Sequence, residues 1–364
     1  MRQKEEQMEI ACWCHLSRDF TGNDDQAKSR MDHAWKGGIN ILLPFIHGEN
    51  DSWYRTNLDY PNNLDRFTRL LKLAKERKIE VHPVVLPITE TGLSENERAR
   101  RGYLSGSAEK ELHKRQFCAT WAETRDGGMK IISDIMENHQ VDGIHLDAIR
   151  YLDTGRSLQS PCQCEACRRQ YRELLGMDTV TAPDLKVPGI LYKFLKFRGE
   201  NILELVKRAN QDVKSRGLKL SMAARSHYLG TPLPLPEDVL SRYFGSSLPE
   251  NQDWGKWSSL VEGQDWVEWA RKGLMDFICP MNYSTDREFH RGRLAEQMAL
   301  IGNSAPIYDG IGRKSSVGEI TPAEMVRQAE DALELGAGGI TIFHFNAMGE
   351  EDFRELSAFR KANA

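Results

Sequence analysis

The stretch VDGIHLDAIRYLD, which runs from Val141 to Asp153, joins an apolar segment to a charged one. Val141, Ile144 and Leu146 favour a β-strand, and the apolar run stops at Asp147. In a parallel barrel, the carboxyl ends of the strands meet at the face where catalytic groups gather. We therefore interpret this stretch as a barrel strand that carries Asp147, the first candidate for a catalytic residue, to the rim.

On both sides of this stretch, β-rich apolar runs alternate with amphipathic helical runs, the pattern of parallel βαβ units. Besides the opening strand, the predicted strands cover residues 9–16, 39–46, 79–88, 218–226, 275–283, 305–311 and 338–346. Predicted helices cover residues 24–36, 63–78 with Asn63 as N-cap, 124–139, 187–215 and 321–337, the last with a Thr321 cap and Pro322 in its first turn. Eight units without a linker predict a single α/β domain over residues 1–364, a (β/α)8 TIM barrel with loop insertions. A doubly wound sheet is the alternative, but the glycine-rich phosphate loop that it needs is absent from the sequence.

The composition of the 364-residue chain, with 40% hydrophobic and 28% charged residues, is typical of a globular protein with a large core. The net charge of -4 and the lack of a basic stripe make nucleic acid a poor candidate partner. No segment approaches the roughly 18 apolar residues of a membrane span, and the N-terminus lacks the apolar run of a secretory signal. We therefore expect no membrane partner and, by default, a cytoplasmic location; the sequence does not indicate an oligomeric state.

The residues expected at the ends of the strands are suited to binding sugars, because aromatic rings offer flat apolar surfaces and polar groups bind hydroxyls. The candidate substrate-binding residues are His15, His47, Glu49, Trp53, His145, Arg150, Arg225, Asn282, Tyr283, His344 and Asn346. For any single aromatic residue the alternative is packing in the core. His145 shares one face of its strand with Asp147, yet it could equally be a buried histidine with both ring nitrogens hydrogen-bonded.

Hydrolysis of a glycosidic bond needs two carboxyl groups that flank the bond. Asp147 is the candidate nucleophile, and Arg150 would hold it ionised, although a plain salt bridge between strand and loop explains the pair equally well. For the acid, Asp309 leads because it lies inside an apolar strand run. Asp286, in the sequence STDRE, and Glu49 are further candidates. An aspartate at a strand end is as often a helix cap or turn residue.

Three of the seven cysteines crowd into the motif CQCEAC, inside a polar insertion over residues 154–186. Thiolates at this spacing suit a tetrahedral zinc ion, so we predict Cys162, Cys164 and Cys167 as ligands, with Cys118 as the fourth. Four protein ligands would make the zinc structural, because a catalytic zinc keeps an open position. Free thiols or a disulfide are the alternatives.

Three segments, INILLPFIHGENDSWYRTNL, NLDRFTRLLKLAKERKIEVHPVV and ETRDGGMKIISDIMENHQVDGIHLDAIRY, together resemble the bacterial glycosyl hydrolase-like family 10 of glycosidases. The resemblance covers most of the chain and implies a (β/α)8 fold and carbohydrate substrates. Members of that family often carry a second acidic or aromatic residue directly after the aspartate, where this chain has Ala148. Asp147 is then the only carboxylate at that rim position.

The first functional hypothesis is therefore a glycoside hydrolase that acts on a poly- or oligosaccharide, with Asp147 as nucleophile and no organic cofactor. The alternative is a non-catalytic carbohydrate-binding barrel, since the acid is not fixed by the sequence. A barrel lyase or aldolase is a third possibility, but no predicted strand ends in the lysine that a Schiff base would require.

Overall fold

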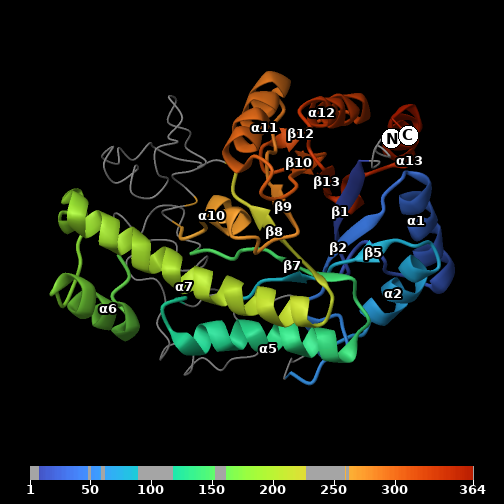
Figure 1. Ribbon diagram of the computed structural model, residues 1–364. Helices are drawn as coiled ribbons and strands as arrows, with labels where there is room; N and C mark the ends of the chain where they lie inside the picture. The colour runs from blue at the N-terminus through green and yellow to red at the C-terminus, as the bar shows by residue number, and fades with distance from the viewer. Residues whose placement is uncertain are drawn as a thin grey trace.

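The computed structural model describes residues 8–47, 51–58, 62–88, 118–151, 161–226, 259 and 262–363. Parallel strands lie at the centre of the molecule and helices surround them (Figure 1). The barrel strands are β1 (Glu9–His15), β2 (Ile41–Phe45), β5 (Glu80–Val81) with β6 (Val84–Val85), β7 (Gly143–Leu146), β8 (Lys219–Ala224), β9 (Phe277–Pro280), β10 (Tyr308–Gly312) and β13 (Gly339–Phe343). The predicted (β/α)8 TIM barrel is confirmed.

The strands follow one another around the barrel in chain order, and every ladder between them is parallel. A parallel bridge between Ile278 and Ile307 joins β9 to the start of β10 and nearly closes the ring. The third strand has two short parts, β5 and β6, because Pro83 lies between them and has no N–H to give to the ladder.

Helices cover the outside of the barrel. They are α1 (Asp24–Lys36), α2 (Phe67–Lys75), α5 (Ala122–Asn138), α6 (Glu165–Leu175), α7 (Pro188–Ser215), α10 (Trp266–Arg271), α11 (Arg287–Ile301), α12 (Pro322–Glu334) and α13 (Glu350–Ala362). Short elements complete the described chain: β3 (Asp51–Ser52), β4 (Asn62–Asn63), β11 (Lys314–Ser315), β12 (Gly318–Glu319), and the 3-10 turns η2 (Asp184–Lys186) and η3 (Phe345–Ala347). Helices α5 and α7 lie side by side along one flank (Figure 1).

The ends of two helices test the predicted caps. Thr321 caps α12 and Pro322 is its first residue, as predicted. The predicted cap of the second helix is wrong: Asn63 lies in β4, and α2 begins only at Phe67. The carboxylate of Asp65 accepts the N–H of Thr68 at 3.1 Å and so satisfies a backbone donor in the first turn of that helix.

The two faces of each barrel strand are buried in different cores, as a side-chain period of two requires. On β1, Ala11 and Trp13 point into the barrel interior, where they join a cluster with Leu43 of β2 and other strands. Ile10 and Cys12 point outward, into the layer between strands and helices. This alternation decides which rim residues face the mouth.

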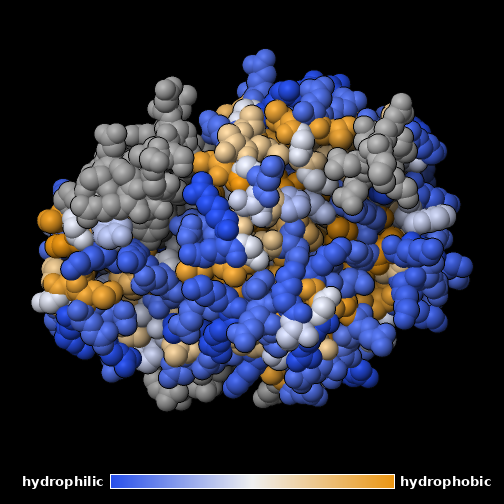
Figure 2. Space-filling view, in the orientation of Figure 1, coloured by the Kyte–Doolittle hydropathy of each residue, from blue (hydrophilic) through white to orange (hydrophobic). Residues whose placement is uncertain are grey.

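Polar side chains cover much of the face seen in Figure 2, with apolar patches between them. Among the described helices, none is both long and apolar enough to cross a membrane.

Candidate active site and cysteine cluster

Asp147 stands at the carboxyl end of β7 and is fixed there by main-chain contacts. Its N–H donates to the carbonyl of Val85 at 2.9 Å, which ties it to β6. Ala148 follows with φ 49°, in the left-handed region that non-glycine residues seldom enter. The N–H of Ala148 donates to Oδ1 of Asp147 at 2.6 Å. The carboxylate is therefore held at the strand end, with 19% of its side chain exposed.

Arg150 pairs with this carboxylate and connects it to a second ion pair, between Glu262 and Arg225. Nη1 of Arg150 lies 3.5 Å from Oδ1 of Asp147, and Nε of Arg150 lies 3.3 Å from Oε2 of Glu262. Arg225 donates two hydrogen bonds of 3.0 Å to Glu262, from Nε to Oε2 and from Nη2 to Oε1. Glu262 is fully buried. Sequence reasoning missed it, because it lies in a loop before α10 and not at a strand end, so no periodic pattern marks it.

Aromatic side chains from three strand ends form the floor of the mouth beside Asp147. The ring of Tyr283 stacks on Phe343 with centroids 5.2 Å apart, and Trp13 meets both rings edge-on at 6.2 and 6.1 Å. Burial and the negative charge of Asp147 raise the pKa of Tyr283 well above its usual value. Tyr283 therefore keeps its proton at neutral pH and can donate a hydrogen bond.

Two histidines, His344 and His15, lie next to the aromatic rings that form this floor. His344 meets Phe343 edge-on at 4.8 Å, and His15 meets His344 at 5.8 Å while it stacks on Phe45 at 4.5 Å. Burial, with Arg18 and His344 nearby, lowers the pKa of His15 to about 4, and burial also lowers that of His344. Both rings are neutral at pH 7 and can bind hydroxyl groups. Phe45 and Phe343 were not predicted, because an apolar residue in a strand looks like core.

Two predicted substrate-binding histidines are instead part of the packed interior. His145 is fully buried: its Nε2 accepts from Trp13 Nε1 at 3.2 Å, and its Nδ1 lies 2.9 Å from Ser221 Oγ. Because an indole N–H can only donate, Nδ1 carries the histidine proton. His47 is 5% exposed and accepts the N–H of Leu86 at 3.4 Å. Both ring nitrogens of His145 and Nε2 of His47 are therefore engaged by the protein itself.

Asp309 and Asn282 point away from the mouth, against the prediction. Tyr308 faces the barrel interior, so its neighbour Asp309 faces the helix layer, as Ile311 does. Asp309 is fully buried; Asn282 donates to its Oδ1 at 2.8 Å, and Nε2 of His290 on α11 lies 3.3 Å from its Oδ2. Burial raises the pKa of Asp309, and this carboxyl lies in the layer between strands and helices.

Asp286 and Trp53 have structural contacts as well. Asp286 is the N-cap of α11, where its Oδ1 accepts the N–H of Phe289 at 3.0 Å, so the helix-cap alternative describes it. Trp53 is half-buried and packs against the main core. Asn346 is exposed in η3, and Glu49 lies outside the described residues. Of the predicted site, the structure brings together Asp147, Arg150, Arg225, Tyr283, His15 and His344.

The four predicted cysteines also come together. The Sγ atoms of Cys118, Cys162, Cys164 and Cys167 all lie within 4.8 Å of one another, and those of Cys118 and Cys167 are 3.5 Å apart. All four are free thiols, so the disulfide alternative is not formed. Zn–S bonds of about 2.3 Å imply sulfur separations of about 3.8 Å in a tetrahedron, and the 3.5 Å between Cys118 and Cys167 is close to that value. Hydrogen bonds from the other thiols lower the pKa of Cys164, whereas the pKa values of Cys118 and Cys167 are raised well above their usual range, so a thiolate is favoured at Cys164 alone of these three.

A chain of contacts joins the cysteine cluster to the mouth. Oγ1 of Thr120 lies 3.3 Å from Sγ of Cys167 and 3.2 Å from the hydroxyl of Tyr151. The N–H of Tyr151 donates to the carbonyl of Glu262 at 2.7 Å. The guanidinium of Arg198 lies 3.9 Å from the centroid of the Tyr151 ring, which holds that ring in place. The cluster thus supports the loop that carries Glu262.

Comparison of the sequence with protein-family models and with curated proteins finds no match, so the resemblance to glycosyl hydrolase-like family 10 is not supported. Solved structures do match. The glycoside hydrolase domain of PgaB (BpsB) from Bordetella bronchiseptica has a TM-score of 0.74 at 12% identity, over 98% of this chain and 99% of that one. The catalytic domain of β-amylase from Paenibacillus polymyxa gives 0.61 at 11%, over 97% of both chains.

A third similar structure is Gan42B, a GH42 β-galactosidase from G. stearothermophilus, with a TM-score of 0.63 at 9% identity; the match covers 99% of this chain and 57% of that one. Identities this low establish likeness of fold alone. The chain therefore has the same (β/α)8 fold as these three glycoside hydrolases.

Proposed function

We propose that this protein is a glycoside hydrolase that acts on a poly- or oligosaccharide with Asp147 as its nucleophile. The observation that carries the proposal is the position of Asp147: a partly exposed carboxylate at a strand end, beside Arg150 and the floor of aromatic rings. Catalytic groups in this fold lie at that end of the barrel. The three similar structures, a glycoside hydrolase domain, a β-amylase and a β-galactosidase, add support at the level of fold.

In the proposed reaction, a carboxylate oxygen of Asp147 attacks the anomeric carbon while the bond from that carbon to the leaving-group oxygen breaks, and the leaving oxygen takes a proton from a general acid. Water then hydrolyses the resulting glycosyl-enzyme ester, which frees the sugar and restores the carboxylate of Asp147. Arg150 forms an ion pair with Asp147, with its Nη1 3.5 Å from Oδ1 of the carboxylate, and so helps to hold that carboxylate in place. Glu262 holds Arg150 and Arg225 in place through its own ion pairs. Tyr283 keeps its proton and serves as a hydrogen-bond donor to the sugar.

The mechanism also needs a general acid, and none of the described carboxyl groups considered so far fits that role. Asp309 faces the helix layer and Asp286 caps a helix, so neither has the geometry. Glu262 is fully buried and its carboxylate oxygens contact two arginines, so it does not face a leaving group at the mouth. Glu49 stays a candidate from the sequence.

Leaving-group dependence tests the acid. An aryl glycoside with a good leaving group needs no protonation, whereas a natural glycan does. If Glu49 is the acid, Glu49→Gln loses activity on the glycan and keeps it on the aryl glycoside. If both activities persist together, Glu49 is not the acid.

A non-catalytic carbohydrate-binding barrel is the second candidate. It is favoured by one observation: within the described residues, neither predicted acid lies beside Asp147. Binding of a glycan in calorimetry without release of product, even on long incubation, would support this alternative.

The main experiment is a glycan panel with product analysis on the wild type and two variants. Asp147→Asn should lower turnover at least about 1000-fold and leave folding intact, since it removes the nucleophile. Asp286→Asn is the matched control: asparagine also caps helices, so we expect activity within about twofold. Wild-type turnover by Asp147→Asn would refute the assignment.

We also propose that Cys118, Cys162, Cys164 and Cys167 hold a structural zinc ion. Support comes from the four sulfur atoms within 4.8 Å of one another, because four thiolates are a ligand set that tetrahedral zinc takes. The ion would tie the insertion around α6 to the start of α5 and, through Thr120 and Tyr151, steady the loop of Glu262. Metal analysis of the purified protein, expected at one zinc per chain, tests this proposal.

A further inference from the structure

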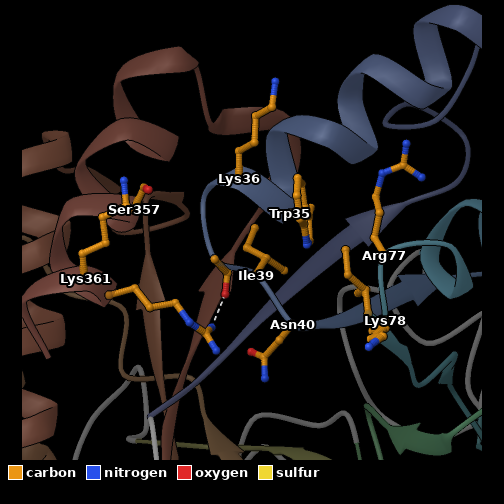
Figure 3. A pocket seen from close by; sticks show the side chains of 11 residues that line it. Trp35, Lys36, Ile39, Asn40, Arg77, Lys78, Ser357 and Lys361 are labelled. Atoms are coloured by element: carbon orange, nitrogen blue, oxygen red, sulfur yellow. Dashed lines mark hydrogen bonds between the residues drawn. The ribbon is translucent and has the colours of Figure 1, made fainter. Parts of the chain in front are cut away.

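A pocket of about 650 Å³ opens at the foot of the barrel, at the amino ends of the strands and so opposite to Asp147. It lies between the last turns of α1, α2 and α13 (Figure 3). The residues that line it are Trp35, Lys36, Gly38, Ile39, Asn40, Arg77, Lys78, Ile79, Ser357, Arg360 and Lys361. Its size is that of a site for a small ligand.

The lining of this foot pocket is strongly cationic. Five of its residues carry positive charge and none carries a carboxylate, in a chain whose net charge is -4. Arg77 is paired with Asp32 at 2.6 Å, and Arg360 donates to the carbonyl of Gly38. In the described part of the chain, no carboxylate lies within 4 Å of the ammonium groups of the three lysines, Lys36, Lys78 and Lys361. Positive charge gathered in a concave site attracts an anion.

The pocket also holds a flat apolar surface. Trp35 has 52% of its surface exposed, and its ring lies between Ile39 and Arg77 in Figure 3. The exposed face of the tryptophan can stack against a ring of a ligand, and the neighbouring cationic side chains can bind an anionic group on that ring. The pocket therefore fits a ligand that combines a ring with an anionic group.

The backbone of Lys78 gives an independent indication that its side chain has a role in the pocket. It has φ 57°, in the left-handed region where a side chain is disfavoured. The corresponding turns after α1, α7, α10 and α12 all have glycine there, at Gly38, Gly217, Gly273 and Gly336, with φ between 65 and 84°. After α2 the chain carries a lysine at this position instead, and that lysine lines the pocket.

We propose that the foot pocket binds an anionic saccharide, a sugar whose ring stacks on Trp35 and whose carboxylate or sulfate group binds Lys78 and its neighbouring cations. The choice of a saccharide rests on the proposed function, whereas the choice of an anion rests on the charge of the pocket. The pocket would be a second carbohydrate site, separate from the mouth, that anchors an acidic glycan to the enzyme.

Calorimetry on the full chain tests this with four probes: trigalacturonate, a heparin-derived sulfated disaccharide, neutral galactotriose and AMP. We expect at least one of the two anionic saccharides to bind, at least tenfold more tightly than galactotriose and more tightly than AMP, with affinity that falls as salt rises. Equal binding of the neutral sugar, tighter binding of AMP, or no binding of either anionic saccharide would overturn the proposal.

Variants locate the site. Trp35→Ala and Lys78→Gly should each weaken binding at least fivefold, Lys78→Arg should restore most of it, and Lys28→Ala, outside the pocket, should have no effect. Lys78→Gly should also raise Tm, because glycine suits the left-handed backbone, so loss of binding cannot be ascribed to unfolding. Wild-type binding by Lys78→Gly and Trp35→Ala would refute the site.

The two proposals fail separately. Asp147→Asn should bind the anionic saccharide at the foot as the wild type does, even though its turnover is lost. Glycan cleavage without binding at the foot would refute only the foot pocket, and binding at the foot without any cleavage would count only against the proposed hydrolase.

Discussion

Replacing Glu262 with glutamine removes a buried negative charge from between Arg150 and Arg225. Glu262 makes two contacts of 3.0 Å with Arg225 and one of 3.3 Å with Arg150, and it is fully buried. Removal of one partner from a buried ion pair costs about 3–5 kcal/mol, because the remaining charge is left uncompensated. Arg225 keeps 18% of its side chain exposed, so we expect the lower end, about 3 kcal/mol.

The assay is urea unfolding of the wild type and Glu262→Gln, read as the free energy of unfolding. Glu268→Gln is the matched control: Glu268 lies on α10, 42% exposed, and pairs only on the surface with Lys272 at 2.7 Å, so its loss should cost less than about 1 kcal/mol. Glycan turnover of Glu262→Gln should also fall, because Arg150 loses the group that positions it. A loss of stability below about 1 kcal/mol for Glu262→Gln, or one equal to that of the control, would show that Glu262 does not organise the mouth.

Three further predictions follow from named contacts. Cys162→Ser should bind no zinc and should lose at least about 3 kcal/mol of stability, measured by metal analysis and unfolding; an unchanged protein would remove the zinc proposal. Burial lowers the pKa of His47 to about 4, so protonation of this histidine favours the unfolded state. Its contribution to stability should be lost as pH drops from about 6.5 to about 4, by up to roughly 3 kcal/mol. His47→Gln should therefore reduce the slope of stability against pH in this range, whereas other histidines whose pKa is lowered, such as His15, keep their share of it; an unchanged slope would contradict the reasoning. Asp309→Asn should keep near wild-type turnover and lose about 1–3 kcal/mol of stability, since it removes the charge beside His290; a large drop in turnover with intact stability would return Asp309 to the active site.

The barrel itself could be predicted from the sequence because parallel strands buried on both faces are continuous apolar runs, and each is followed by a helical period. The carboxyl end of a strand is then marked by the first charge, which is why Asp147 and Arg150 were found. The three cysteines of the short motif could be recognised as a group from their close spacing, and Cys118 was expected to join them; the structure brings all four together.

The direction of each rim side chain could not be predicted by the same argument. In a strand buried on both faces, apolar residues do not distinguish the inner face from the outer one, so Asp309 was placed on the wrong side. His145 does face inward, but Trp13 and Ser221 take both of its ring nitrogens. Glu262 reaches Arg225 across 37 residues of sequence through tertiary packing alone, which no local pattern records.

The role of Asp147 as nucleophile is tested most directly by trapping the glycosyl-enzyme. The probe is a 2-deoxy-2-fluoro glycoside of whichever sugar the glycan panel identifies, followed by intact mass measurement and peptide mapping. A retaining mechanism predicts a covalent label on Asp147, on the peptide that contains VDGIHLDAIRYLD, and none on the Asp147→Asn variant. A label on another carboxylate, or products of inverted configuration with no label at all, would contradict the assignment.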